Sequence, residues 1–212
     1  RRLAQSVANV SADKPVWNTE SASAQCGGQA GFSDRMVDAI WQTDWLGLMA
    51  EEGTSLVVRH SLVGADYSLL APDTFEPRPT FLATAWMRRH VRNVVFATEV
   101  NREELWARSY CGVEDDVTVV MGNPYPSARR ATVEIGSEIV QARAWSVSSA
   151  DGLTGAVANV NGAGVAEDGT MPNPPGFTVE TEGDGFVVEV APASVLFVSL
   201  DLEAAPALCE GP

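Results

Sequence analysis

The hydrophobic pattern changes its period near residue 93, and this change is the strongest constraint on the fold. Before it, apolar residues recur at three- and four-residue spacings in stretches that alternate with short apolar runs. After it, short β-branched runs follow one another, separated by turns that contain Gly, Pro, Asn or Asp. The first pattern predicts parallel strands joined by crossover helices, and the second predicts antiparallel sheets. We therefore expect an α/β unit over residues 1–93 and an antiparallel β-sandwich over residues 94–212.

The first unit is expected to contain three helices and two strands. In chain order these are a helix through Leu3, Val7 and Val10 that ends before Pro15, a strand at 16–19, a helix from an N-cap at Ser33 or Asp34 to Gly53, a strand at 55–63, and a helix at 80–91. The second helix has one broad face that we expect to be buried, formed by Met36, Val37, Ile40, Trp41, Asp44, Trp45 and Leu48.

The second unit is expected to contain eight short strands. They are predicted at residues 94–98, 105–108, 117–121, 131–135, 144–147, 177–180, 186–190 and 195–200. Gly183, Asp184 and Gly185 form a turn signal before the seventh of them. A long loop rich in Gly, Asn and Pro is expected at residues 161–176.

The chain is acidic, and its charge is uneven. Its 212 residues carry 14 Lys and Arg against 28 Asp and Glu, a net charge of −14, with Lys14 as the only lysine. Residues 1–108 hold 11 basic and 13 acidic groups, whereas residues 109–212 hold 3 and 15. Such a chain is a poor ligand for polyanions, and it has no apolar run of about 18 residues. We therefore expect no nucleic-acid partner and no membrane span.

The clearest candidate for chemistry is Glu20, which directly follows the predicted strand at 16–19. Enzymes with α/β folds place catalytic groups at the carboxyl ends of parallel strands. From its position alone, however, Glu20 is more typical of an ordinary loop glutamate. Two histidines far apart and three scattered cysteines provide no metal-ligand spacing, so we expect no metal site and no cofactor.

The segment around Glu20 resembles the nucleophile segment of heparanase and the related β-glucuronidases, glycoside hydrolase family 79. The residues that carry this resemblance are 17–28 (WNTESASAQCGG), 32–35 (FSDR), 41–48 (WQTDWLGL), 57–60 (VVRH), 64–67 (GADY), 75–81 (FEPRPTF) and 160–162 (VNG). The match is clear over about residues 3–98 and is weaker, but collinear, to the end of the chain.

The resemblance implies a retaining glycosidase built from a TIM barrel followed by a β-sandwich. Glu20 matches the nucleophile, which attacks the anomeric carbon, while a second carboxyl group protonates the leaving oxygen. In the family that acid/base follows an Asn in an Asn-Glu pair, and this sequence has no such pair. A complete barrel takes about 250 residues. We therefore expect the C-terminal portion of a barrel, with the acid/base on a missing N-terminal barrel segment.

The resemblance also implies residues that bind the substrate. Gly27 and Gly28 match backbone N–H groups that meet a uronate carboxylate, and Tyr67 matches a tyrosine whose hydroxyl reaches it. His60 matches a polar position that faces the sugar. The alternatives are a flexible glycine loop, a half-buried loop aromatic and a hydrogen-bonded core histidine. Arg59 either braces the barrel or touches the substrate.

Cys111 and Cys209 match a family pair that forms a disulfide, the alternative being two buried thiols. A bridge would imply an oxidising compartment and thus a secreted or extracytoplasmic protein. Cys26 is interpreted as a small loop residue, because no histidine and asparagine accompany it as a thiol nucleophile requires. His90 is expected either at the surface or as a C-terminal cap of its helix.

The leading hypothesis is a glycosidase that cleaves β-linked glucuronic acid from an oligosaccharide or glycoside. Only Arg88, Arg89 and Arg92 form a basic cluster, so a glucuronide of modest charge is favoured over a sulfated polymer. A retaining glycosidase of the same clan that acts on a neutral sugar is one alternative. A non-catalytic carbohydrate-binding fragment is another.

Overall fold

The computed structural model describes residues 14–99 and 105–207, together with Ser6, Val7, Asn9, Ser11 and Cys209. The helix expected through Leu3, Val7 and Val10 lies largely outside these residues. Among the helices of the described part, none has the length and apolar character needed to cross a membrane.

The first layer is a strand–helix–strand unit followed by a second helix. Strands β1 (Val16–Ser21) and β2 (Thr54–Arg59) pair in parallel, and α2 (Met36–Glu51) connects them. Helix α3 (Pro79–His90) follows β2 and packs against α2. Pro79 occupies the first turn of α3, where its ring fixes φ at a helical value. N–H groups in the first turn have no partner within the helix, so the missing N–H of proline costs no hydrogen bond. The parallel pairing expected for this part of the chain is confirmed.

A large antiparallel sheet follows, with its strands in the order β3-β4-β5-β12-β7-β8 and β9 paired to β7. Its strands are β3 (Val91–Phe96), β4 (Trp106–Gly112), β5 (Val117–Asn123), β7 (Ile139–Ser148), β8 (Asn159–Val160), β9 (Phe177–Thr178) and β12 (Ser194–Leu202). Central β12 pairs with both β5 and β7. Eight of its nine residues are buried, so both of its faces are covered by other layers.

A three-stranded sheet covers one face of the large sheet. It consists of β6 (Arg129–Glu134), β10 (Thr181–Glu182) and β11 (Gly185–Val190) in the order β10-β11-β6. Alternate residues of β11 point inward, and the first core joins Phe186 and Val188 to apolar residues of β5, β7 and β12. This alternation is the pattern of strands with one buried and one solvated face.

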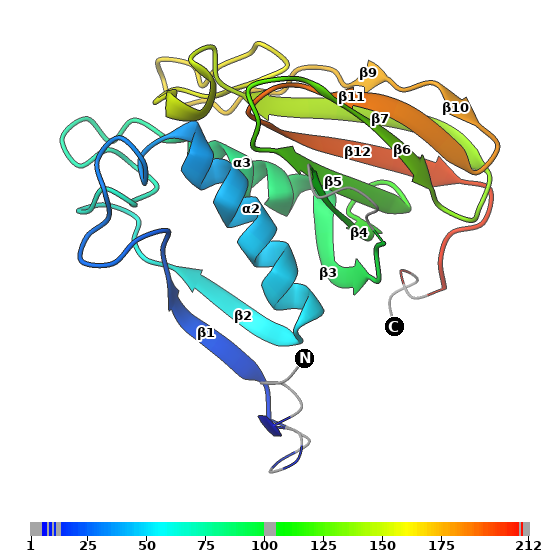
Figure 1. Cartoon of the computed structure of the whole chain (residues 1–212), viewed down its shortest axis with the longest axis horizontal. Helices are drawn as coiled ribbons and strands as arrows, with labels where there is room; N and C mark the ends of the chain where they lie inside the picture. The colour runs from blue at the N-terminus through cyan, green and yellow to red at the C-terminus, as the bar shows by residue number, and fades with distance from the viewer. Residues whose placement is uncertain are drawn as a thin grey trace.

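The two helices cover the opposite face of the large sheet. The second core joins Met36 and Ile40 of α2 and Trp86 of α3 to Val120 and Phe197 of the sheet. A short 3-10 helix, η1 (Gly152–Thr154), lies beside the start of α2. Figure 1 shows the helices on one side of the large sheet and β6, β10 and β11 on the other.

The predicted start and buried face of α2 need correction. The helix begins after Arg35, and no side chain caps its N-terminus. The Ser33 hydroxyl instead accepts a hydrogen bond from the Gln29 N–H. The Met36 N–H donates to the Gly155 carbonyl at 2.9 Å. Its buried face carries polar as well as apolar residues, whereas Leu48 of the predicted face is exposed. The buried residues are Met36, Asp38, Ala39, Ile40, Gln42, Thr43 and Gly47.

His90 was expected either at the surface or as a C-terminal cap of its helix, and the surface position is wrong. Its side chain is buried in the second core, with its ring 4.5 Å from that of Trp145 and 5.6 Å from that of Trp86. Its Nδ1 lies 3.3 Å from the Ser199 hydroxyl. Burial, with a smaller contribution from Arg89, lowers the pKa of His90 to about 4. The helix end turns inward at this residue, while Arg88 and Arg89 remain exposed.

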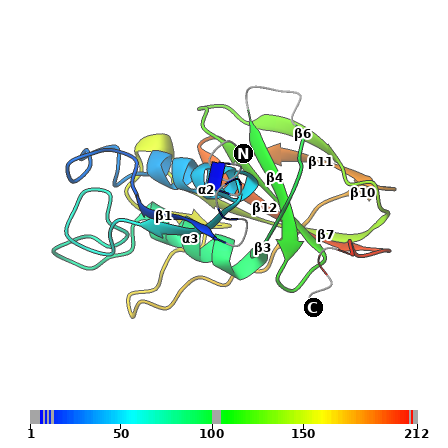
Figure 2. The ribbon, with the colours of Figure 1, turned by 90° about the horizontal axis from the view of Figure 1, so that it is seen from below.

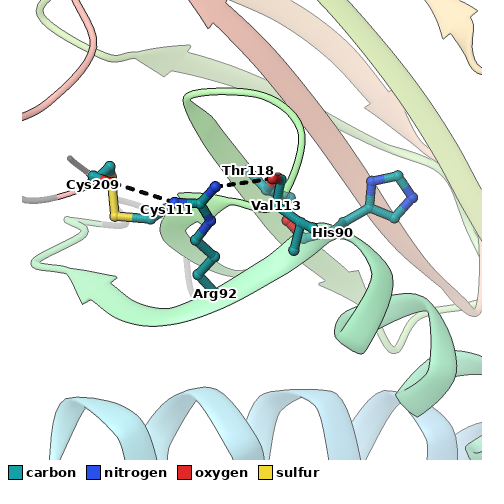
Figure 3. The surroundings of a disulfide bond; sticks show 6 residues. All are labelled: His90, Arg92, Cys111, Val113, Thr118 and Cys209. Carbon is teal, nitrogen blue, oxygen red and sulfur yellow. Dashed lines mark hydrogen bonds between the residues drawn. A yellow bond between two sulfur atoms is a disulfide. The ribbon is translucent and has the colours of Figure 1, made fainter. Parts of the chain in front are cut away.

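The disulfide expected from the resemblance is present. Cys111 of β4 is bonded to Cys209, 98 residues further along the chain, with 5.4 Å between their Cα atoms. Arg92 of β3 donates to the carbonyls of Cys209 at 3.4 Å and Val113 at 3.1 Å, so it bridges the tail and the β4–β5 turn (Figure 3). Cys209 is thus linked to the large sheet by the disulfide and by its hydrogen bond with Arg92.

Candidate active site at the ends of two parallel strands

The residues expected to act on a substrate lie at the carboxyl ends of β1 and β2. Glu20 is exposed near the end of β1, and exposed His60 directly follows β2. The His60 N–H donates to the Ser21 carbonyl at 3.0 Å, so the two strand ends are joined. The loops that follow both strands extend from this same end of the molecule in the two views (Figures 1 and 2).

The two loops contact each other at Gly27, Gly28 and Tyr67. Both glycines have φ in the left-handed region, +96° and +100°, which disfavours other residues. The Asp66 N–H donates to the Gly27 carbonyl at 2.7 Å. A Cβ atom on Gly28 would lie 2.8 Å from the backbone nitrogen of Tyr67, so only glycine allows this close approach. The Gly28 N–H donates to the Gln25 carbonyl at 3.2 Å.

Tyr67 is buried rather than half-buried, and its ring lies beside the imidazole of His60. The two ring centroids are 5.4 Å apart with a tilt of 59°, and only 6% of the tyrosine surface is exposed. The structure therefore brings Gly28, Tyr67 and His60 together, with Glu20 on the adjoining strand end. Cys26, the residue before this glycine pair, is an exposed free thiol.

Arg59, at the end of β2, has hydrogen-bond partners on α2 and in the loop after β2. Its Nη2 donates to Asp38 Oδ2 and to the Tyr67 carbonyl, and its Nη1 donates to Gln42 Oε1, each at 2.7 Å. The guanidinium also lies 5.7 Å from the Trp41 ring centroid. Of the two roles considered for Arg59, these contacts support bracing.

The electrostatics of this pair are dominated by burial. Burial raises the pKa of Asp38 above its usual value, and attraction to Arg59 together with the hydroxyls of Ser23 and Thr80 opposes the shift. Burial likewise lowers the pKa of Arg59, against the attraction of Asp38. Removing both charges from water is costly, so the pair is poor evidence for added stability.

A second arginine holds the loop that carries Tyr67. Arg78, just before α3, donates from Nη1 to the carbonyls of Ala65 at 2.9 Å, Ser68 at 3.2 Å, and also Asp66. With the Arg59 bond to Tyr67, four consecutive carbonyls over residues 65–68 accept hydrogen bonds from guanidinium groups. The loop is thus held by charge-assisted bonds rather than by regular secondary structure.

Sequence reasoning missed the residues that support the site. Asp38 and Gln42 stand four residues apart on α2, so they share a helical face that meets β2. Two polar residues at this spacing, inside an apolar helix, are the signal that could have revealed them. Within residues 14–99 and 105–207, no three His, Cys, Asp or Glu side chains gather closely enough to hold a metal ion.

Glycoside hydrolases are among the solved structures that share this fold. A 4-O-α-L-rhamnosyl-β-D-glucuronidase from Fusarium oxysporum matches with a TM-score of 0.72 and 17% identity, over 94% of this chain and 47% of that one. A family 30 subfamily 8 xylanase from Clostridium acetobutylicum matches with a TM-score of 0.65 and 14% identity, over 95% of this chain and 45% of that one. The fold is therefore shared with parts of TIM-barrel glycosidases.

The curated relatives that this chain resembles include glucuronidases and heparanase-like proteins. A hyaluronoglucuronidase from Hirudo nipponia is 34% identical over 98 residues, 46% of this chain and 20% of the relative. Baicalin-β-D-glucuronidase from Scutellaria baicalensis is 27% identical over 122 residues, 56% and 23% respectively. Inactive heparanase-2 from Homo sapiens is 25% identical over 100 residues, 47% and 17%. No family model matches the chain.

These matches confirm the resemblance to the heparanase and β-glucuronidase family over about half of the chain. The matched stretch spans about a fifth of the length of these relatives.

Proposed function

We propose that this chain is the nucleophile-bearing C-terminal portion of a retaining glycoside hydrolase that cleaves β-linked glucuronic acid. The observation that carries the proposal is that Glu20 is exposed near the carboxyl end of β1, which is joined to the end of β2 where His60, Tyr67 and Gly28 meet. In this proposal residues 1–93 are the last strands and helices of a TIM barrel. Residues 94–212 are its β-sandwich.

The proposed reaction takes two steps. A Glu20 carboxylate oxygen attacks the anomeric carbon, the glycosidic C–O bond breaks, and an acid on another barrel segment protonates the leaving oxygen. Water, deprotonated by the same group, then attacks the anomeric carbon and releases Glu20 and glucuronic acid. The overall change is the addition of one water across the glycosidic bond.

Recognition of the uronate carboxylate is assigned to the loops after β1 and β2. The Gly27 N–H and the Tyr67 hydroxyl are the proposed donors, and His60 is the proposed contact to the sugar. Gly28 has a different share in the proposal, because its N–H already has the Gln25 carbonyl as partner. Its absent side chain lets the two loops meet.

The exposed face of the β1–β2 sheet supports an incomplete barrel. Trp17 of β1 pairs with Leu56 of β2, and they are 60% and 42% exposed, with Val58 exposed beside them. A contiguous apolar sheet face of this kind normally has a partner. The N-terminal barrel segment is the proposed occupant, and it would bring the acid/base with it.

The compartment is proposed from the disulfide. A bond between Cys111 and Cys209 suits an oxidising environment, which supports a secreted or extracytoplasmic protein.

The proposal is tested with the full-length protein that carries this chain, on aryl β-glucuronide, β-glucoside and β-xyloside substrates. We expect hydrolysis of the glucuronide to be preferred by at least about tenfold in kcat/KM, because the anionic carboxylate has dedicated donors. The Glu20→Gln variant should lose about 10³-fold or more in kcat. Preference for a neutral sugar would replace the uronate assignment by the neutral-sugar alternative.

A non-catalytic role is the second candidate, favoured by the similarity to inactive heparanase-2. A protein of this kind would bind the glucuronide without turnover. Calorimetric binding of a glucuronide, together with no hydrolysis by the wild-type protein, would support this candidate and contradict the enzyme.

A further inference from the structure

Arg59 makes its three shortest hydrogen bonds to three residues on two different segments. They reach Asp38 and Gln42 on α2 and the main-chain carbonyl of Tyr67 in the loop after β2. The Arg59 side chain is 7% exposed and the Asp38 side chain is fully buried. A planar guanidinium can satisfy several acceptors in one fixed arrangement, which a lysine ammonium does not reproduce.

Asp38 connects this arginine to the rest of the site's scaffold. Its Oδ2 atom also accepts the hydroxyl hydrogen of Thr80 on α3. The Ser23 hydroxyl lies close enough to Asp38 to lower the pKa of that carboxyl, and Ser23 stands three residues after Glu20. This one buried carboxylate of α2 therefore joins β2 to α3, and Ser23 of the loop after β1 influences it.

Burial of the Asp38–Arg59 ion pair removes two charges from water and therefore costs free energy. Replacing a buried ion pair by apolar residues is often neutral or stabilising, so stability alone does not explain it. A fixed geometry is the other attested use of buried charges. The group that Arg59 fixes here is the backbone of Tyr67, whose ring contacts His60 and whose nitrogen lies against Gly28.

We propose that Asp38 is a positioning residue that acts through Arg59 to hold Tyr67 in its binding position. This inference rests on the proposed function for its effect on substrate, and on the hydrogen bonds alone for its effect on the loop. Gln42 and Thr80 complete the arrangement by fixing Arg59 and Asp38 respectively.

The test uses the Asp38→Asn variant, which keeps the size of the side chain and removes its charge. Asp44→Asn is the matched control, because Asp44 lies on the same helix and pairs with a different arginine, Arg108, on the side of the large sheet. Hydrogen exchange of the 61–70 segment should become about tenfold faster in Asp38→Asn and should not change in Asp44→Asn. Equal exchange in both variants would overturn the proposal.

A kinetic measurement separates positioning from a general loss of structure. Because Tyr67 is assigned to substrate binding, KM for an aryl β-glucuronide should rise about tenfold in Asp38→Asn, with kcat within about twofold of wild type. A fall in kcat with unchanged KM would contradict the positioning role. If the segment loosens as expected but the wild-type protein hydrolyses no glucuronide, the positioning stands and the proposed function fails.

If Asp38→Asn does not fold, the variants Thr80→Val and Thr80→Ser provide a second test. Valine removes the hydroxyl that donates to Asp38, and serine keeps it. Faster exchange of residues 61–70 in Thr80→Val, restored in Thr80→Ser, supports the proposal. The same exchange rate in both variants would overturn it.

Discussion

Burial is the largest influence on the pKa values of three residues, one on each helix and one at the end of β2. It raises the pKa of Asp38, lowers that of Arg59, and lowers that of His90 from 6.5 to about 4. The first two share a hydrogen-bonded arrangement, whereas His90 Nε2 has no hydrogen-bond partner within the described part of the chain. Of these three residues, His90 is therefore the one that the folded state most clearly keeps in its neutral form.

The folded protein should become less stable as the pH falls, because protonation of buried His90 is unfavourable. Since the folded pKa lies below the unfolded value, the stabilising contribution is complete above about pH 6.5 and falls as the pH drops towards 4. The loss reaches up to about 3 kcal/mol at the lower limit. Urea unfolding of wild type and His90→Leu at pH 7, 6 and 5 measures it, and the free-energy difference between them should change with pH.

A pH dependence that is the same in His90→Leu as in wild type would contradict the buried, neutral state of His90.

At the scale of elements, β12 and the disulfide determine how the β part is assembled. β12 lies between β5 and β7 and contributes to both cores, so it joins the layer of helices to the three-stranded sheet. The chain after β12 returns to β4 through the bond between Cys209 and Cys111. A cross-link over 98 residues restricts the unfolded chain strongly.

Loss of this disulfide should destabilise the protein by about 4–5 kcal/mol in the chain-entropy estimate. Cys209→Ala, measured by urea unfolding, should show this loss, and reduction of wild type should approach the same value. Cys26→Ala is the matched control, because Cys26 is a free and exposed thiol. A change below about 1 kcal/mol in Cys209→Ala would show that the bond adds no significant constraint.

The elements were more predictable from the sequence than their partners. Alternation on β11 reveals its buried face, and the β-branched run of β12 predicts a strand. Its place between β5 and β7 depends on residues about 50 to 80 positions away, which no local pattern records. Glu20, Tyr67 and the glycines were identified by resemblance, whereas Asp38 was missed because a charged residue on a helix is ordinarily solvated.

At the scale of the whole molecule, the helices of the strand–helix unit pack on one face of the large sheet, and the three-stranded sheet packs on the other. Helix α2 contacts the large sheet and also β2, while α3 packs against α2 and the large sheet, so β2 is connected to the large sheet through α2. The opposite face of β1 and β2, with Trp17 and Leu56, is exposed. In the proposed function, this exposed face is the one that the N-terminal barrel segment would cover.

The most direct measurement is covalent trapping of the nucleophile in the full-length protein that carries this chain. A 2-fluoro-glucuronyl fluoride should form a stable ester with the carboxylate that attacks the anomeric carbon. Mass spectrometry of the digested protein is expected to find the sugar on Glu20 in wild type and on no residue in Glu20→Gln. A label on another carboxylate, or one that persists in Glu20→Gln, would contradict the assignment of Glu20 as the nucleophile.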